Sequence, residues 1–232
     1  MNIMANIKAQ SAARKYQKGE VEAAKQLYEE ALKMGLNEPR SILSYSVLLL
    51  RGGEYQKARE LLVQHQKNPM LNAENKKQLY VNYAVCMYKL GDHDKAIRVL
   101  ESQHQKDPSG LVYQTLGYLY VATGDTDKAV SFNQEALEYD DEDPITLDNL
   151  GQAYYRVNKD KNKAKEYFEK ALAQKPGQID TLYFLAQYDI EAGDQKAAAE
   201  KLQTALEGRF SPLNHATKEM IEEQLKTLKT EA

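Results

Sequence analysis

The segments LDNLGQAY at residues 147–154 and AKEYFEKALAQKP at residues 164–176 decide the fold. Leu147, Leu150 and Tyr154 recur at steps of three and four residues, which is the spacing of one face of an α-helix. The alanines and the phenylalanine of the second segment follow the same spacing, and it ends in a proline, a residue that helix interiors exclude. The two segments therefore predict two helices joined by a short turn.

Related copies of this pattern recur along the chain at intervals of 33 to 38 residues. An alanine opens the second helical run of each copy: Ala24, Ala58, Ala96, Ala129, Ala164 and Ala198. A glycine stands five residues before all but one of these alanines: Gly19, Gly53, Gly91, Gly124 and Gly193. The fifth copy has NKDKN at residues 158–162 instead, a turn built from other residues that tolerate unusual backbone angles.

The prolines lie between the end of one copy and the start of the next: Pro39, Pro69, Pro108, Pro144, Pro176 and Pro212. Proline breaks a helix interior, whereas glycine supplies the positive φ that ends a helix. Each copy therefore predicts a helix, a tight turn, a second helix and a linker. Small residues such as Gly117 and Gly151 on the first helices let the second helices approach closely.

This pattern resembles the tetratricopeptide repeat, whose 34-residue unit reads W-x2-L-G-x2-Y, then A-x3-F, then P. The resemblance implies an all-α fold, a right-handed α-solenoid of six helical hairpins with a C-terminal capping helix, in one domain over residues 1–232. The predicted units span residues 5–38, 39–70, 71–109, 110–143, 144–177 and 178–210, and the predicted capping helix spans residues 212–229. A cap is expected because the last repeat of a solenoid otherwise exposes an apolar face.

Several features depart from the family pattern. Tryptophan is absent. The interval of 38 residues before Ala96 predicts one added helical turn near residues 71–77. Asn133 replaces the usual aromatic residue, so its amide is either hydrogen bonded to a neighbouring backbone or turned outward. Ile3, Met4 and Ile7, on or near the outer face of the first unit, predict either a frayed or self-covering end, or a contact with another subunit or with an upstream segment.

The composition is that of a folded chain, with 42% hydrophobic and 28% charged residues. The net charge of −3 argues against a nucleic-acid partner, and no segment predicts a membrane span or a signal peptide. A single cysteine, Cys86, suits a reducing compartment. We therefore expect a cytoplasmic protein; the alternative is a membrane-anchored protein whose anchor lies in an upstream segment.

Motifs that carry catalysis or bind cofactors are missing from the sequence. The four histidines lie in different units without a metal-ligand spacing. Cys86 lies among apolar positions of a first helix and is expected to be a core residue. The acidic run at 140–143 precedes a helix start, where the helix dipole stabilises carboxylates. We expect no enzyme activity, no metal and no cofactor.

In the tetratricopeptide family the first helices line the concave face, on which ligand peptides commonly lie. Carried over to this chain, the resemblance predicts ten partner-binding residues: Arg14, Arg51, Asn82, Lys89, Tyr118, Gln152, Tyr155, Arg156, Tyr183 and Gln187. The early residues are basic, whereas the later ones are aromatic and amide-rich and neighbour Asp148, Asp180 and Glu191. We therefore predict a groove that is basic at one end and aromatic, amide-rich and mildly acidic at the other, and that binds a peptide of matching polarity. The alternative is an ordinary solvated surface.

The function that this reasoning favours is a protein–protein interaction scaffold that binds an unidentified protein or peptide along the concave groove. Two alternatives stay open: a regulator that responds to a small peptide, and a cell-envelope assembly factor whose anchor is missing from this chain. The family's carboxylate clamp for chaperone tails is absent, because Gln10, Ser44 and Gln78 stand at three of its positions. A homo-oligomer formed through the N-terminal end is a further possibility.

Overall fold

The computed structural model describes residues 2–230, and the regular structure within this range is helical. Contacts divide the chain into two compact units, one ending at Asp107 and the other beginning at Pro108. We call them the N-terminal unit and the C-terminal unit and describe each by itself. Their helices form the hairpins of an all-α solenoid, as predicted; the prediction of a single domain stays a prediction.

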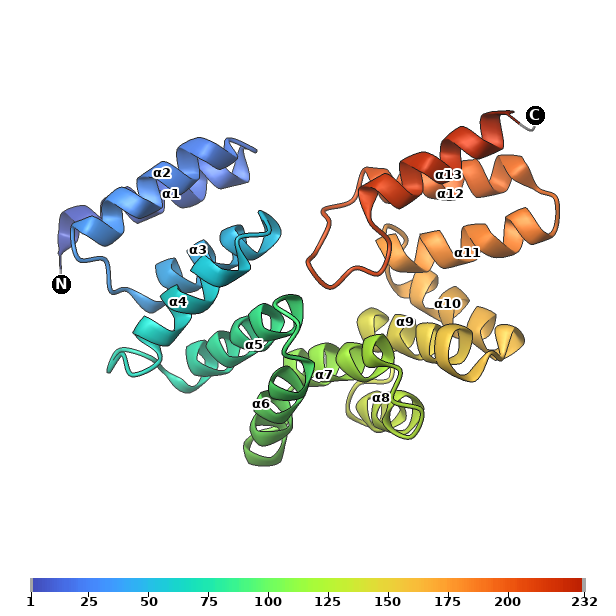
Figure 1. The fold of residues 1–232 in the computed structure, drawn as a ribbon, viewed down its shortest axis with the longest axis horizontal. Coiled ribbons are helices and arrows are strands. Elements are labelled where there is room, and N and C mark those ends of the chain that lie inside the picture. Colours follow the sequence, from blue (N-terminus) through green and yellow to red (C-terminus); the bar gives the residue numbers. More distant parts are fainter. Residues whose placement is uncertain (1, 231–232) are drawn as a thin grey trace. The chain divides into compact units, whose positions relative to one another are not determined.

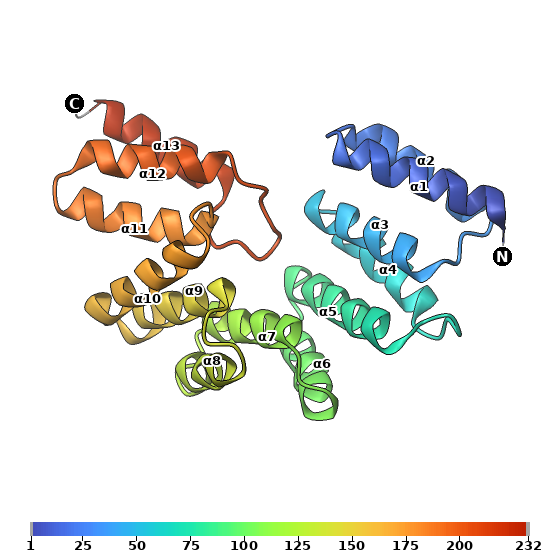
Figure 2. The same cartoon turned by 180° about the vertical axis from the view of Figure 1, so that it is seen from behind.

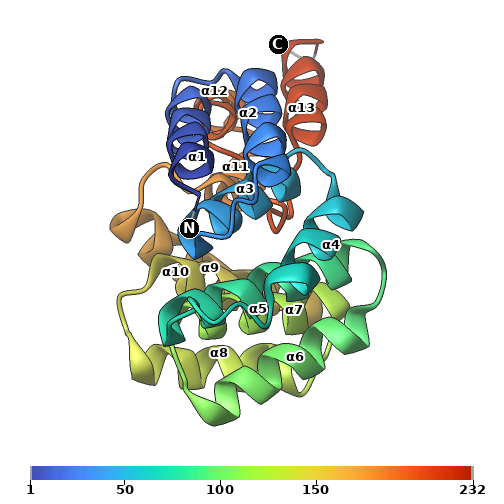
Figure 3. The ribbon, with the colours of Figure 1, turned by 90° about the vertical axis from the view of Figure 1, so that its left-hand side faces the viewer.

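The N-terminal unit contains three antiparallel helical hairpins, drawn in blue to green in Figure 1. Its helices are α1 (Ile3–Gln17), α2 (Val21–Lys33), α3 (Pro39–Arg51), α4 (Tyr55–His65), α5 (Ala73–Lys89) and α6 (His93–Lys106). Figure 3 shows α1 and α2 side by side as such a pair. Gly19, Gly53 and Gly91 adopt positive φ in the three tight turns, as the sequence predicts.

The C-terminal unit contains three further hairpins and an additional helix (Figure 2). Its elements are α7 (Gly110–Thr123), α8 (Lys128–Tyr139), α9 (Pro144–Gln152), η1 (Ala153–Asn158), α10 (Lys161–Gln174), α11 (Ile179–Glu191), α12 (Gln195–Leu206) and α13 (Lys218–Thr230). The additional helix, α13, packs against α12 and closes the apolar core formed by α11 and α12.

The six repeat alanines are fully buried, which confirms their predicted place where two helices meet. Two first helices use glycine at this close approach. A Cβ atom on Gly117 would lie 2.1 Å from Oδ1 of Asn133, and one on Gly151 would lie 2.5 Å from the ring of Phe168. The second helix can therefore pack against α7 and α9 only because these positions have no side chain.

The two long repeat intervals, of 38 and 35 residues, have a structural explanation. The helix α5 has 17 residues whereas α3 has 13, so the predicted extra turn lies in α5. In the fifth repeat, one extra residue between Gly151 and Ala164 is accommodated by the π-helix η1. The turn after it is closed by a hydrogen bond from the Asp160 amide to the Tyr154 carbonyl, and Lys159 takes the left-handed conformation at φ 61°.

The capping helix begins six residues later than predicted, at Lys218 rather than at 212. The intervening segment makes its own turn, in which the side chain of Asn214 accepts a hydrogen bond from the Ser211 amide, and Thr217 then accepts one from the Met220 amide in the first turn of α13. At the other end of the chain, Ile3 and Met4 are exposed, as expected from their outward position. Asn133 is buried and donates its amide to the carbonyls of Gly117 and Ala129, which settles the alternative left open above.

Candidate functional site

The first helices of the N-terminal unit are basic. Their lysines and arginines are Lys8, Arg14, Lys15, Arg40, Arg51, Lys76, Lys77 and Lys89, against one acidic residue, Glu74. Arg40 and Arg51 are both exposed and lie at opposite ends of α3. The guanidinium of Arg51 donates a 3.3 Å hydrogen bond to the Tyr16 hydroxyl of α1, so the two first helices present a polar surface together.

Two lysines on the second helices of the same unit are neutralised by glutamates. Lys25 of α2 lies 2.6 Å from the carboxylate of Glu54, and Lys57 of α4 pairs with Glu29 of α2. A hydrogen bond from Lys57 holds the pKa of Glu29 below its ordinary value. Among residues 2–230, no carboxylate forms an ion pair with Arg40. Ion pairs also hold Lys8, Lys15 and Lys77 of the first helices, whereas Arg40 and Arg51 keep exposed charges on α3.

The predicted contact residues of the N-terminal unit fall in different environments. Asn82 is buried, accepts from Gln78 and donates to the Ser46 hydroxyl at 2.8 Å, so a partner does not reach it in this structure. Arg14 is exposed, yet its counterpart ten residues before the repeat alanine is the buried Leu48 in α3. Arg14 therefore lies on a side of α1 that later first helices bury.

Lys89 and Arg51 complete the predicted set of the N-terminal unit. Lys89 is half-buried beside the Tyr88 ring, and burial lowers its pKa. Arg51 is exposed. Together with Arg40, these two side chains form what we call the basic face: Arg40, Arg51 and Lys89.

The first helices of the C-terminal unit have the opposite charge. They contain Asp148, Asp180, Asp189 and Glu191 and only Arg156 as a base. Most of this charge is used internally. Asp189, for instance, pairs with Lys201 of α12 at 2.5 Å.

Asp148 and Asp180 form a buried pair of carboxyl groups, each 4% exposed. The amide of Gln152 donates to both, at 2.7 Å to Asp148 and 3.4 Å to Asp180, and the Thr181 hydroxyl donates to Asp148 at 2.6 Å. Burial raises the pKa of both groups, and the negative charge of Asp180 raises that of Asp148 further. One carboxyl of the pair therefore retains its proton to a higher pH than an exposed aspartate does.

An aromatic cluster adjoins this pair. The ring of Phe184 stacks on that of Phe168 with centroids 5.0 Å apart, and Tyr155 contacts Phe184 at 5.1 Å. Tyr183 lies edge-on to Phe184 at 5.5 Å. Tyr155 and Tyr183 are thus partly buried against aromatic neighbours, whereas Tyr118, in α7, is 7% exposed and belongs to the interior.

Polar contacts hold the remaining predicted residues. Gln152 is fully buried between the two carboxyl groups and accepts a 2.9 Å hydrogen bond from Arg156, which is partly buried. Gln187 exchanges two hydrogen bonds with Gln224 of the capping helix. We leave the buried Asn82, Tyr118 and Gln152 out of the contact surface because side-chain access is closed in this structure.

Sequence reasoning missed the segment that covers this site. Residues 207–217 connect α12 to α13 and contact the first-helix face of α11 through His215 and Ala216. The Ser211-Pro212 pair predicts a helix start, but the large distance in sequence between the last repeat and the apolar positions of α13 is the signal for a connecting segment. The predicted contact residues Tyr183 and Gln187 therefore meet this chain's own C-terminal segment.

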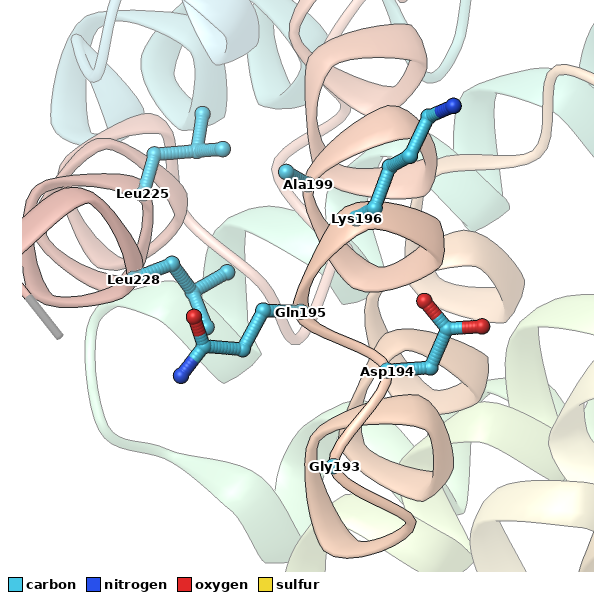
Figure 4. Close-up of a pocket in the computed structure, with 7 residues that line it drawn as sticks. All are labelled: Gly193, Asp194, Gln195, Lys196, Ala199, Leu225 and Leu228. Carbon is cyan, nitrogen blue, oxygen red and sulfur yellow. The ribbon is translucent and has the colours of Figure 1, made fainter. Parts of the chain in front are cut away.

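A cavity of about 510 Å³ separates α12 from α13. Its lining consists of Gly193, Asp194, Gln195, Lys196, Ala199, Leu225 and Leu228. Figure 4 shows Leu225 and Leu228 facing Gln195 and Ala199 across it. The carboxylate of Asp194 is used as the cap of α12, because it accepts from the Ala197 amide at 2.9 Å. This cavity is thus mainly aliphatic and brings no reactive groups together.

Two kinds of feature are missing from the described part of the chain. Residues 2–230 contain no group of three or more histidine, cysteine, aspartate or glutamate side chains placed to hold a metal ion. Within the same range no helix has the length and apolar character needed to cross a bilayer.

Comparison with known proteins agrees with this architecture. A family model described as tetratricopeptide repeat matches residues 9–139, more than half of the chain, and a second model of the same description matches residues 146–178. The chain therefore belongs to the tetratricopeptide repeat family. Members of this family generally act as non-catalytic scaffolds that mediate protein–protein interaction.

Individual relatives are more distant. The TPR repeat-containing protein YpiA of Bacillus subtilis is 30% identical over 135 residues, 58% of this chain and 32% of that protein. The peroxisomal targeting signal receptor of Kluyveromyces lactis is 32% identical over 112 residues, 48% of this chain and 19% of the receptor. The matches thus span a third or less of these relatives' lengths.

A solved structure shows the same fold. That of PilW, titled a widely conserved type IV pilus biogenesis factor, superposes with a TM-score of 0.68 at 18% identity and covers 99% of this chain and 100% of that chain. At this level of identity the similarity establishes the fold alone.

Proposed function

We propose that this chain is an interaction scaffold that binds a protein or peptide partner on its first helices, and that the basic face of the N-terminal unit is the main contact surface. The observation that carries the proposal is the distribution of charge. Lys25 and Lys57 of the second helices and Lys8 of α1 are paired with glutamates, whereas Arg40 and Arg51 of α3 are exposed to solvent.

This distribution favours an acidic partner. Complementary charge steers encounter and selects partners, and arginine in particular binds carboxylates through two parallel hydrogen bonds. The peroxisomal targeting signal receptor, with which the chain shares 32% identity over 112 residues, is named for recognising a targeting signal, which supports a peptide as one class of ligand. Cys86 is buried, and burial raises the pKa of its thiol to about 12. These observations support a structural role for this thiol.

A binding role also fits better than a catalytic one. The buried carboxyl pair of the C-terminal unit is the group with the most perturbed acid–base chemistry, but its oxygens are occupied by Gln152, Thr181 and two backbone amides. We infer a non-catalytic protein and, from the single reduced cysteine, a cytoplasmic one.

The test uses a fluorescein-labelled hexaglutamate peptide and fluorescence anisotropy with the full chain. We expect saturable binding that weakens as salt is added, because surface charge interactions are screened. The double variant Arg40→Ala/Arg51→Ala should lose roughly tenfold in affinity, which is about 1.4 kcal/mol. The matched control is Lys33→Ala/Arg98→Ala, which removes two exposed charges from second helices of the same unit.

Equal losses in the two double variants would show that only net charge matters and would refute the basic face. The absence of any salt-dependent binding by the unaltered chain would refute an acidic partner altogether.

A further inference from the structure

The connection between the last two helices is unusually long and lies on a first-helix face. It spans residues 207–217, whereas residues 175–178 suffice to join α10 to α11. Within it, the Asn214 amide donates to the Ser211 carbonyl at 3.0 Å, and the Leu213 amide donates to the Ser211 hydroxyl. We call residues 211–216 the latch segment. These bonds give it a defined turn of its own.

Asp180 holds the latch segment through backbone contacts. One carboxylate oxygen accepts from the His215 amide at 2.9 Å and the other accepts from the Ala216 amide at 3.0 Å. Asp180 is in the first turn of α11, which belongs to the series of first helices that we predict to bind a partner. A carboxylate that receives two successive backbone N–H groups is a recognition device for a peptide main chain, independent of its side chains.

A side chain of the latch segment occupies an aromatic site next to this carboxylate. The His215 ring stacks on Phe184 with centroids 5.1 Å apart and planes 19° apart, and it lies 6.1 Å from the ring of Tyr183. Burial, followed by the charge of Arg156, lowers the pKa of His215 to about 4, so the ring is neutral at pH 7 and stacks as an ordinary aromatic group. A phenyl or indole ring has the same stacking surface.

The capping helix adds one more contact on this face. The amides of Gln187 and Gln224 exchange hydrogen bonds of 3.0 and 2.7 Å, which anchor α13 one turn beyond Tyr183. These contacts are polar or aromatic and lie on the first-helix side of α11. The apolar packing of α13, through residues such as Ile221 and Leu225, is directed to the core formed with α12.

We propose that the first-helix face of α11 is a second peptide-binding site, occupied in this structure by the chain's own latch segment, which an external peptide must displace. The external ligand is a short segment that directs two consecutive backbone N–H groups to Asp180 and places an aromatic or imidazole ring on Phe184. The inference rests on the proposed function, because it treats the first helices as ligand-binding surfaces. It adds that the site in the C-terminal unit is self-inhibited.

Self-occupancy has a quantitative consequence. A tethered segment competes at an effective concentration on the order of millimolar. The apparent dissociation constant for an external peptide then equals the intrinsic constant divided by the fraction of molecules whose site is open. Weakening the latch segment should therefore strengthen external binding, which is the opposite of what removing a contact residue normally does.

The test uses a fluorescein-labelled peptide with the sequence of residues 209–217 and the full chain. His215→Ala removes the stacked ring of the latch segment and leaves its backbone donors in place. We expect this variant to bind the peptide at least about tenfold more tightly than the unaltered chain, and to exchange the amide hydrogens of residues 209–217 faster. Gln224→Ala, which removes the partner of Gln187 and loosens α13 but leaves Asp180 and the latch segment unchanged, should shift affinity in the same direction.

The control is the same peptide with Ala216→Pro, which lacks the second N–H donor and should not bind either variant. The proposal is overturned if the latch amides exchange faster but the peptide does not bind, because the segment is then only a structural cap. It is equally overturned if neither variant changes exchange or affinity. Hexaglutamate binding, which reports on the basic face, is measured in the same samples, so failure of the proposed function is seen separately.

Discussion

The two units are built from the same repeat but use their first helices differently. In the N-terminal unit α3 carries the exposed side chains of Arg40 and Arg51, although Lys8 of α1 pairs with Glu30 of α2. In the C-terminal unit the first helices carry the buried, hydrogen-bonded carboxyl groups of Asp148 and Asp180, and Asp180 also binds the amides of His215 and Ala216 in residues 207–217. The comparison teaches that the repeat pattern specifies where a surface lies, whereas the residues outside the pattern decide whether it is open.

Both units join successive hairpins by ion pairs and by stacked rings. In the N-terminal unit Lys57 of α4 pairs with Glu29 of α2, and the Tyr28 and Tyr45 rings stack between α2 and α3. In the C-terminal unit Lys161 pairs with Glu191, and the Phe168 and Phe184 rings stack between α10 and α11. Because exposed ion pairs contribute about 0–1 kcal/mol and buried rings several times more, changes to the rings should have the larger effects.

The largest expected effect is that of Phe168→Ala. Its ring is fully buried in the aromatic core of the C-terminal unit, and truncation should cost about 3–5 kcal/mol. If the two units are separate cooperative bodies, amide exchange should accelerate in α9–α11 and not in α3 and α4. The matched variant Leu62→Ala, which empties the corresponding position of α4, should give the reverse pattern. Equal acceleration everywhere would indicate a single domain instead.

Gly151→Ala tests the close approach of α9 and α10. The added Cβ would lie 2.5 Å from the Phe168 ring, and such overpacking costs about 1–3 kcal/mol, less about 0.5–1 kcal/mol because alanine favours the helix. The urea midpoint of the C-terminal unit should fall. In the N-terminal unit Ala84 of α5 lies twelve residues before the repeat alanine Ala96, as Gly117 does before Ala129, so Ala84→Gly serves as the converse variant and should cost the helix-propensity difference plus the loss of one buried methyl group. An unchanged midpoint for Gly151→Ala would contradict the packing described here.

The sequence predicted the hairpins because their determinants are local: the spacing of apolar positions, the glycine turns and the linker prolines. It also predicted the added turn of α5. It misplaced the start of the capping helix, because Ser211 and Pro212 imitate a helix start while the contacts that hold the latch segment lie more than thirty residues away, on Asp180. Long-range polar contacts of this kind leave no periodic signal.

The candidate site was predictable only in part for the same reason. Charge on the first helices can be counted in the sequence, and Arg40 and Arg51 are exposed as a surface role requires. Burial of Asn82 and Gln152 could not be foreseen, because it depends on which neighbour offers a hydrogen bond. Ser46 does so for Asn82, and the Asp148–Asp180 pair does so for Gln152.

A pH-dependent difference between the units is expected from the buried carboxyl pair. Because burial raises the pKa of Asp148 in the folded chain, the native state binds more protons than the unfolded state, and stability falls as pH rises through this range. The fall in the unaltered chain is at most about 1.4 kcal/mol per pH unit. Asp148→Asn should remove it. Urea midpoints measured between about pH 4.5 and pH 7.5 check it. Parallel curves for the two proteins would contradict the assignment.

The smallest expected effect concerns the one tight turn that lacks glycine. Lys159 adopts φ 61°, a left-handed conformation that costs a residue with a side chain about 1–2 kcal/mol, whereas Gly53 meets the same requirement in the N-terminal unit without strain. Lys159→Gly should raise the stability of the C-terminal unit by about 1 kcal/mol or less, since glycine also loses more entropy on folding. Thermal unfolding measures the effect, and Lys175→Gly, which lies in a linker, is the control. A fall in the stability of Lys159→Gly would show that the turn is unstrained.

The most direct test of the account is to map where an acidic peptide binds. A hexaglutamate peptide that carries a photoreactive diazirine is cross-linked to the full chain, and the labelled residues are identified by mass spectrometry. The account predicts labels on α3 and α5, around Arg40, Arg51 and Lys89, and their loss in the Arg40→Ala/Arg51→Ala variant. Labels concentrated on α9 and α11, or spread evenly over both units, would contradict it.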